Sequence, residues 1–591
     1  MGKAHDRWLD LLVLVGYALL SLAYAWPLIA HFGDRLAGDG FDMYVFQWGN
    51  WWITRALSQG QSLYQTKMIF YPHGASLYFL SFSWLNTFVW WLLRAIVSNV
   101  AAYNFTVWWS WPLAGFGAYL LAREVTGDRR AAFIAGLVYA FYPYHFAQRN
   151  HLNLLSVQWI PFALLFLMRA ARRGRVLDGL LAGLSFACAG LSGWHLLTLS
   201  GMLGGLWLLW LVARSGDRPQ QWSGDRPQQW SDRSQQRSGN QPQRGAWAGT
   251  SWRALLVMVV TVGLLTGPFL VPLAWEQFVN PEGQDLYLGR EGETQTDLIA
   301  YVLPNLYHPL WGRLAAPVHQ RFLRNKDHAV ALGYVPLALV GYGLLRWRAS
   351  TRRTRFWFGG LLVFWLLALG PFPRVNGVPY PQIPLPYRLV GWALPVRSLR
   401  NPERFNIIVG LCLALVVGAV VRDLLHRLPA CRAGIAVVVL SALVLLEYWA
   451  WPFPTTRPDV PDFYHQLAIE PGDFAIVDLP ITNDLSKLYM YYQIVHCRPT
   501  VTGHVSRPPE GAYDFITSRP TLDALWKTRR PPVDRRLSDD VGWLAKVGIG
   551  YVVAHRDLMD SDEWVTWQCY ADIAPVFVGD GLYVYSAEGV R

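Results

Sequence analysis

The sequence has 591 residues, of which 53% are hydrophobic and only 16% are charged, and its formal net charge is +12. Soluble proteins rarely reach this ratio over such a length. The apolar residues come in blocks of about 15–23, close to the length that crosses a bilayer. The composition therefore excludes an ordinary soluble protein and predicts a polytopic α-helical membrane protein. The positive charge indicates no nucleic-acid partner, because the arginines gather in short loops between the blocks.

Eleven apolar blocks are expected to span the membrane. In chain order they are about 8–30, 104–122, 131–147, 154–171, 177–193, 196–213, 253–275, 330–347, 356–370, 406–424 and 433–453. The first block is too long for the core of a signal peptide, and no small-residue cleavage site follows it.

Each even-numbered block is followed or flanked by a basic loop, which the positive-inside rule places in the cytoplasm. The amino terminus is then inside, and the first outer loop (31–103) and the C-terminal tail (454–591) lie outside the cytoplasmic membrane. Residues 84–97 are also apolar, but a crossing there would invert either the first span or every later basic loop. We therefore expect 84–97 to lie at the outer interface or to dip into it, with Arg94 reaching the headgroups.

Two segments differ in composition from the spans. Residues 214–252, within the membrane domain 1–453, contain Ser-Gly-Asp-Arg-Pro-Gln-Gln-Trp twice in tandem, which predicts a disordered cytoplasmic spacer. In the tail, the patterns predict strands at Phe474–Leu479, Ile549–Val553 and Gly581–Ser586, and helices at Leu485–Ile494 and Thr521–Thr528. The tail is therefore expected to be a small extracytoplasmic α/β domain, in which Cys497 and Cys569 form a disulfide or remain two free thiols.

The polar residues that could carry chemistry converge on the outer face of the membrane. Asp39 and Asp42 lie in Gly-Asp-Gly-Phe-Asp, directly after the first block. A carboxylate within hydrogen-bond reach can deprotonate a sugar hydroxyl, and a second carboxylate nearby can raise the pKa of the first. The alternative is that either aspartate caps a juxtamembrane helix. The later outer loops add the candidate residues His145, Arg149, His151, His308, Arg400 and Arg404.

The order of these motifs resembles the GT-C superfamily of polyprenyl-phosphate-sugar-dependent glycosyltransferases, and within it bacterial integral membrane glycosyltransferase-like proteins. The resemblance covers residues 1 to about 450. The motifs that carry it are Gly38–Asp42 with Trp48 and Trp52, Phe70–Pro72, Leu137–Tyr144, His151–Pro161, His308–Gly312 and Arg400–Phe405.

The resemblance implies that Asp42 acts as general base on the acceptor or as a metal ligand that orients it, with Asp39 in support. Asp42-Met-Tyr-Val-Phe-Gln resembles the Asp-Pro-Tyr-Phe-Asn pattern of oligosaccharyltransferases. The second outer loop, about 141–153, has histidines where those enzymes have a further acidic pair, so a two-carboxylate metal site is in doubt. Asp42 with His145 or His151 could still bind Mg²⁺ or Mn²⁺, although the sequence requires no metal and hydrogen bonding is the alternative role of the histidines.

A phosphate leaving group needs cationic partners. Arg149, Arg400 and Arg404 are the candidates, because guanidinium groups bind phosphate oxygens bidentately. For Arg400 and Arg404 the alternative is anchoring to lipid headgroups. His308 suits loop structure as well as it suits substrate binding.

The sequence thus predicts a membrane enzyme that transfers a sugar from a polyprenyl-phosphate donor to a glycan, lipid or protein acceptor at the outer face of the membrane. One alternative is a non-catalytic protein that handles or flips lipid-linked glycans. A second is a secondary transporter, which should show charges near the bilayer midplane and repeated halves. The charges lie instead at span ends and in loops, which favours the transferase.

Overall fold

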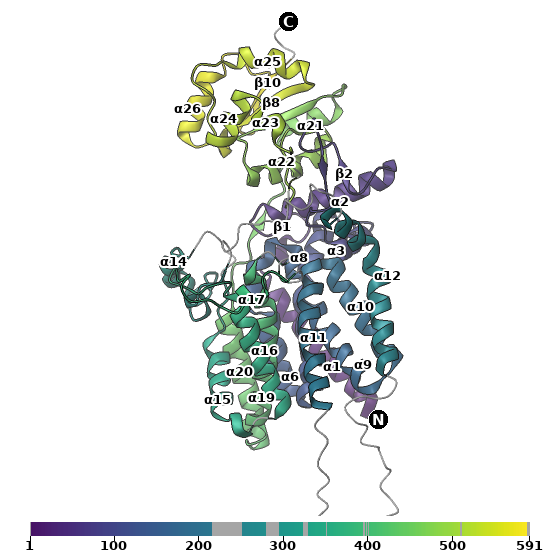
Figure 1. Cartoon of the computed structure of the whole chain (residues 1–591). Coiled ribbons are helices and arrows are strands. Elements are labelled where there is room, and N and C mark those ends of the chain that lie inside the picture. The colour runs from purple at the N-terminus through teal and green to yellow at the C-terminus, as the bar shows by residue number, and fades with distance from the viewer. Residues whose placement is uncertain are drawn as a thin grey trace, which may run out of the picture.

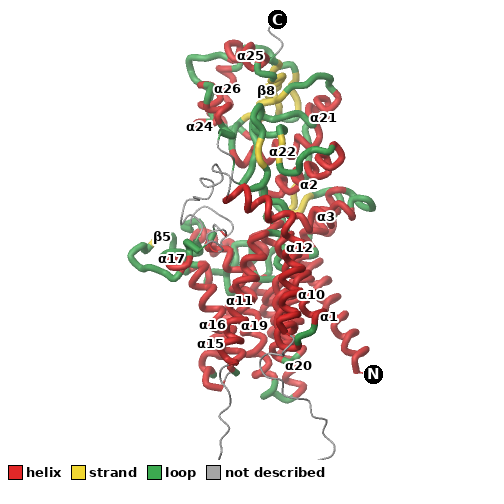
Figure 2. The backbone as a smooth tube through the Cα atoms, turned by 45° about the vertical axis from the view of Figure 1, so that its right-hand side comes forward, coloured by secondary structure: helices red, strands yellow, loops and turns green. Residues whose placement is uncertain are grey.

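The computed structural model describes residues 2–215, 251–278, 295–322, 329–349, 351–393, 396, 399, 401–506, 508 and 511–587. Helices form a bundle in the lower part of Figure 1, and the tail forms a layer above one end of that bundle. The N-terminus lies at the opposite end. Figure 2 shows the same division, with the sheet around β8 in the upper layer. Most of the expected spacer at 214–252 and the candidate Arg400 lie outside the described residues.

A helix occurs at each of the eleven apolar blocks. These helices are α1 (Gly2–Tyr24), α5 (Ser110–Thr126), α6 (Arg129–Ala140), α9 (Trp159–Arg173), α10 (Val176–Ser192), α11 (Trp194–Ser215), α12 (Ser251–Phe278), α15 (Tyr334–Leu345), α16 (Arg352–Ala368), α19 (Asn406–Leu425) and α20 (Ala430–Tyr448).

Six helical stretches of the described chain are long and apolar enough to cross a membrane, and α10 and α15 are shorter apolar helices. The stretches are His5–Tyr24, Leu152–Arg173, Trp194–Arg214, Ser251–Glu276, Pro402–Leu425 and Ala430–Tyr448. The chain therefore has a polytopic helical membrane fold, while the number of eleven crossings stays a prediction.

The bundle is built around α19, which is buried on all sides from Asn406 to Val421. A helix that is apolar all round belongs in the interior. In contrast, α12 and α20 are apolar but mostly exposed, as expected for helices that face lipid.

Ion pairs gather the basic turns at the end of the bundle where α1 begins. Arg123 and Arg129 of the α5–α6 turn pair with Asp10 and Asp6 of α1, and the Arg129–Asp6 pair measures 2.9 Å. Arg173, at the end of α9, pairs with a carboxylate of α5 at 3.0 Å. This basic end lies opposite the tail, in agreement with the predicted alternation of loops.

The segment expected at the interface forms the ten-residue helix α3 (Trp84–Leu93). Ten residues make a helix of about 15 Å, which cannot cross a hydrocarbon core of about 30 Å. The side chains of Phe88, Trp91 and Leu92 are about half exposed. Together with α2 (Asp42–Gln59), α3 lies at the tail end of the bundle, as Figure 1 shows.

The tail contains a four-stranded sheet in the order β7-β8-β10-β9. The parallel pair is β7 (Ala475–Leu479) and β8 (Ile549–His555), and β10 (Leu582–Ser586) lies antiparallel to β8 and to β9 (Phe577–Gly579). The three predicted strands and the two predicted helices are present, whereas β9 was not predicted. The tail helices of eight residues or more are α21 (Asp462–Ile469), α22 (Asn483–His496), α24 (Pro520–Thr528), α25 (Leu537–Lys546) and α26 (Ser561–Tyr570). Cys497 and Cys569 are free thiols.

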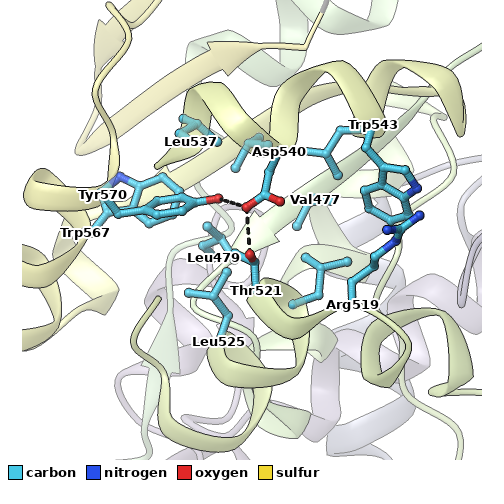
Figure 3. A pocket seen from close by; sticks show the side chains of 13 residues that line it. Val477, Leu479, Arg519, Thr521, Leu525, Leu537, Asp540, Trp543, Trp567 and Tyr570 are labelled. Atoms are coloured by element: carbon cyan, nitrogen blue, oxygen red, sulfur yellow. Dashed lines mark hydrogen bonds between the residues drawn. The ribbon is translucent and has the colours of Figure 1, made fainter. Parts of the chain in front are cut away.

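The tail core includes a nearly buried carboxylate that joins three helices, as Figure 3 shows. Asp540 of α25 accepts hydrogen bonds from Thr521 Oγ1 of α24 (2.7 Å) and from the Tyr570 hydroxyl of α26 (2.8 Å). Beside it, the guanidinium of Arg519 lies 3.9 Å from the ring centre of Trp543. The cavity between these residues measures about 20 Å³. That space suits about one water molecule, so this region is packed core and not a substrate site.

Hydrogen bonds fix the tail on the first outer loop. Trp48 of α2 is fully buried and donates from Nε1 to Gln493 Oε1 of α22 at 2.7 Å. The amide nitrogen of Gln493 donates to the carbonyl of Met68 at 2.6 Å. The Tyr71 hydroxyl donates to the carbonyl of Val547 at 2.9 Å. Buried polar contacts of this kind demand a defined geometry, so the loop and the tail form one packed unit.

A short sheet adds a second connection between the two parts. β1 (Leu36–Ala37) pairs antiparallel with β6 (Thr455–Thr456), which follows α20. The Gly38 amide donates to the carbonyl of Pro454 at 3.0 Å. This pairing holds the segment just before Asp39 against the beginning of the tail.

Two native cysteines offer a direct test of orientation. Cys569 in α26 of the tail and Cys431 at the start of α20 are both exposed, and α20 begins shortly after His426, which lies 3.9 Å from Asp128 at the basic end of the bundle. In variants that retain only one of them, we expect a membrane-impermeant maleimide to label Cys569 but not Cys431 in intact cells. Both should react after permeabilisation. Labelling of Cys431 alone in intact cells would reverse the orientation and move the tail inside.

Candidate active site

The Gly-Asp-Gly motif allows a close approach between the first and second outer loops. The Oδ1 of Asn150 accepts a hydrogen bond from the Asp39 amide at 3.0 Å. A Cβ atom would lie 2.4 Å from the Asn150 side chain at Gly38 and 2.5 Å from it at Gly40, both too close for any side chain. Gly38 also has a φ of +117°, which L-residues rarely adopt. The two glycines therefore flank Asp39 because the Asn150 amide packs against both.

Asp39 is paired with the buried arginine of the second loop. Arg149 Nη2 lies 2.6 Å from Asp39 Oδ1 and 2.9 Å from Oδ2. The Arg149 side chain is fully buried, and its guanidinium lies 4.5 Å from the ring centre of Tyr307 and 5.1 Å from that of Phe146. A buried cation requires a nearby counter-charge, so Asp39 has a structural task that holds the second loop in place.

Asp42 lies at the junction of three parts of the chain. His151 Nε2 of the second loop is 3.3 Å from Asp42 Oδ2, and Lys487 Nζ of α22 in the tail is 3.2 Å from Oδ1. Lys487 is also 3.0 Å from Asp484 Oδ1. The side chain of Lys487 is 9% exposed, whereas that of Asp42 is 33% exposed. A substrate can therefore reach Asp42 while the lysine forms the wall behind it.

The charges around Asp42 decide its protonation state. Burial alone would raise the pKa of this carboxyl, but the hydrogen bond with His151 and the charges of His151 and Lys487 outweigh it and hold the pKa well below its usual range. His504 acts in the same direction. For Lys487, burial lowers the pKa, but the neighbouring carboxylates outweigh burial and raise it. The pair is therefore ionised at neutral pH.

This environment limits what Asp42 can do. A carboxylate with a lowered pKa is a weak general base but a strong hydrogen-bond acceptor. The pKa of Asp42 is lowered and not raised, because the hydrogen bond with His151 and the charges of His151, Lys487 and His504 outweigh burial. Asp42 is the first residue of α2 and its side chain makes no capping hydrogen bond there, since Phe41 is the N-cap residue. The geometry suits a group that orients an acceptor hydroxyl.

The structure brings together part of the predicted metal set. Asp42 and His151 meet, whereas His145 is buried with its ring against Tyr139 and Tyr142 at 4.9 and 6.0 Å between ring centres. Within the described ranges, no group of three or more His, Cys, Asp or Glu residues could hold a metal ion. Asp42 and His151 are the residues that would bind a divalent cation, and metal dependence stays a prediction.

His308 and Arg404 both bind backbone carbonyls. His308 Nε2 lies 2.8 Å from the carbonyl of Leu446 in α20, and its Nδ1 accepts hydrogen bonds from the amides of Leu310 and Trp311 at 3.1 and 3.2 Å. Arg404 donates to a carbonyl at 2.7 Å. For His308 this geometry supports the loop-structure alternative, because both ring nitrogens maintain the turn that presents the neighbouring Tyr307 to Arg149.

A cavity of about 460 Å³ lies in the loop before α15, next to α15 and α20. Its walls are mostly aromatic and aliphatic and include Tyr301, Trp311, Leu337 and Leu446. Among the described residues that line it, Glu447 alone is charged, and its carboxylate accepts a hydrogen bond from the Val335 amide at 3.1 Å. Such a cavity suits an apolar molecule or chain.

No family model matches the chain, and no curated protein matches it. Solved structures do match. The arabinofuranosyltransferase AftD from Mycobacteria has a TM-score of 0.56 and 14% identity, over 98% of this chain and 40% of its own. The chain therefore shares its fold with this arabinofuranosyltransferase. Two other matches have TM-scores below 0.5. The oligosaccharyltransferase AglB from Archaeoglobus fulgidus, in complex with an inhibitory peptide and a dolichol-phosphate, has 0.48 and 14% identity over 96% of this chain and 71% of its own. ArnT from Cupriavidus metallidurans has a TM-score of 0.41 and 13% identity, over 99% of this chain and 98% of its own.

Four residues of this candidate site were missed by the reasoning from sequence. Lys487 and His504 come from the tail, for which no motif was recognised. Asn150 and Tyr307 are neighbours of candidates that were singled out, Arg149 and His308. A signal was available for the contact with Asn150, because Gly38 and Gly40 flank Asp39. Closely spaced glycines often mark a place where another part of the chain approaches the backbone closely.

The interaction energy between Asp39 and Arg149 can be measured by a double-mutant cycle with Asp39→Asn and Arg149→Gln. Each single variant should lower the thermal unfolding midpoint of the detergent-solubilised protein. The coupling free energy should be about 0.5–3 kcal/mol, because the two groups contact each other directly. Asp34→Asn is the matched control, since Asp34 is an exposed aspartate of the same loop, with a side chain 65% exposed. Additive effects of the two substitutions would show that the pair does not hold the loops together.

Proposed function

We propose that this chain is a membrane glycosyltransferase that moves a sugar from a polyprenyl-phosphate donor to a hydroxyl group of an acceptor at the outer face of the cytoplasmic membrane. The observation that carries the proposal is the partly exposed, ionised carboxylate of Asp42, held by His151 and Lys487. The GT-C fold supports a glycosyltransferase at the level of the fold.

The reaction assigns a role to each of these three groups. Asp42 accepts a hydrogen bond from the acceptor hydroxyl and orients its oxygen toward the anomeric carbon of the donor sugar. The new glycosidic bond forms as the bond from that carbon to the phosphate oxygen breaks, and polyprenyl phosphate leaves. The hydroxyl proton passes to the carboxylate of Asp42, which His151 borders. The ammonium group of Lys487 has three N–H donors, and two carboxylates, those of Asp42 and Asp484, lie within ion-pair distance of it. The third can bind a phosphate oxygen.

The cavity beside α15 and α20 supports a lipid-borne donor. Its aromatic and aliphatic walls can hold part of an isoprenoid chain, and Tyr307 of the same loop contacts Arg149, which pairs with Asp39. A divalent cation bound by Asp42 and His151 would supply further charge for the leaving phosphate.

The carboxylate of Asp42 is the first target for mutagenesis. Asp42→Asn keeps the shape but removes the charge, so transfer from a radiolabelled polyprenyl-phosphate sugar should fall roughly 10²–10⁴-fold. Asp34→Asn should transfer at the wild-type rate. Thermal unfolding of both variants controls for folding. If Asp42→Asn transfers normally, the assignment is wrong. If the protein moves lipid-linked sugar across vesicles without transferring it, the flipping alternative replaces the enzyme.

The pH profile tests the role of Lys487. Because this lysine lowers the pKa of Asp42, Lys487→Met should raise that pKa. Asp42 must be ionised to accept the hydroxyl proton, so the acid limb of the kcat/KM profile should move to higher pH. Lys487→Arg keeps the charge and should leave the limb near its wild-type position. Lys527→Met, at a lysine 63% exposed elsewhere in the tail, is the control. An unshifted limb in Lys487→Met would show that Lys487 does not act through Asp42.

A further inference from the structure

A second polar cavity, of about 350 Å³, lies between α2, α3, the start of α4 (Asn99–Trp108) and α22. None of the described residues that line it is acidic, and two are arginines, Arg55 of α2 and Arg94 directly after α3. The other lining residues include the amide side chains of Gln47 and Asn99. The cavity therefore offers cations and hydrogen-bond donors without a counter-charge.

Each arginine is held on a tryptophan of its own helix. The guanidinium of Arg55 lies 5.4 Å from the ring centre of Trp51, and that of Arg94 lies 4.9 Å from that of Trp90. In both pairs the tryptophan precedes the arginine by four residues, so the two side chains share one helix face. Within the described part of the chain, no carboxylate lies within ion-pair distance of either guanidinium. Stacking leaves the guanidinium N–H groups available for an anion.

Gln47 adds an independent sign of a ligand. Its side chain is 7% exposed and lines the cavity, and its amide nitrogen has no hydrogen-bond partner among the described residues. A buried donor without a partner costs about 1–3 kcal/mol. An oxygen-rich group in the cavity would satisfy this donor and balance the charge of the arginines.

The position of α3 indicates where such a ligand comes from. Trp90 and Arg94 line the cavity, whereas Phe88, Trp91 and Leu92 of the same helix are exposed. A short helix with one exposed apolar face and one basic face lies in the plane of the bilayer surface. The cavity is then at the depth of lipid headgroups, where phosphate is the abundant anion.

We propose that this cavity is a binding site for the phosphate group of an anionic membrane lipid, held by Arg55, Arg94 and Gln47. The lipid anchors α2 and α3 at the membrane surface. The site is separate from Asp42 and does not depend on the proposed transferase activity, because Asp42 is not among its lining residues.

Native mass spectrometry of the purified full chain tests the proposal. The probes are dioctanoyl phosphatidylglycerol, dioctanoylglycerol, which lacks the phosphate, and inorganic phosphate. Phosphatidylglycerol should bind the wild-type chain at one site, and dioctanoylglycerol should not. The double variant Arg55→Gln, Arg94→Gln should bind at least about tenfold more weakly. If inorganic phosphate displaces phosphatidylglycerol, the phosphate group alone is the ligand. If inorganic phosphate does not displace it, the intact lipid headgroup is the ligand.

The matched control is the double variant Arg214→Gln, Arg253→Gln. These arginines also lie on tryptophans, at 4.5 Å from Trp210 and 5.4 Å from Trp252, but they are not among the lining residues of the cavity. The control should bind as the wild type does. Gln47→Leu, which keeps both arginines, should also weaken the binding of phosphatidylglycerol. It replaces the Arg55, Arg94 double variant as the test if that variant does not fold.

Asp42→Asn should retain phosphatidylglycerol binding whether or not it transfers sugar, so the two proposals fail separately. Equal binding of phosphatidylglycerol and dioctanoylglycerol would show that the cavity does not recognise the phosphate group, and would overturn the proposal. Wild-type binding by the Arg55, Arg94 double variant, or by Gln47→Leu where that double variant does not fold, would overturn it as well.

Discussion

The carboxylate of Asp42 is the point at which three separate parts of the chain meet. It belongs to the first outer loop and is bound by His151 from the second and by Lys487 from the tail. A lysine that is almost fully buried needs a carboxylate partner, so the docking of α22 on α2 depends on this contact. The hydrogen bond between Trp48 and Gln493 fixes the same two helices. The tail is thus a wall of the candidate site.

Two neighbouring aspartates have different tasks because their partners differ in burial. Arg149 is fully enclosed by aromatic rings, so Asp39 serves as its counter-charge. Asp42 faces the exterior and keeps a third of its side chain exposed. Two like charges so close in sequence would normally oppose each other's ionisation. Here each carboxylate has its own cation, Arg149 beside Asp39 and Lys487 beside Asp42.

The sequence predicted the membrane helices and the main tail strands, because both follow from the length and the period of apolar runs. It also named His145 or His151 as a possible second ligand beside Asp42 in a metal site, and the structure places His151 there. It could not find Lys487, which is 445 residues from Asp42 and belongs to no recognised motif. His145 and His308 were candidates by residue type alone. Their burial among aromatic rings and backbone carbonyls depends on packing that no local pattern reveals.

Helix α2 explains how one surface element can serve both polar sites. Asp42 is its first residue and Arg55 lies 13 residues further on, about 20 Å along the helix axis. The carboxylate stands at the first residue of α2, whereas the arginine lies near its other end, four residues before Gln59. Under the two proposals, one helix therefore carries the contact with the sugar donor at its beginning and the contact with the anionic lipid near its end.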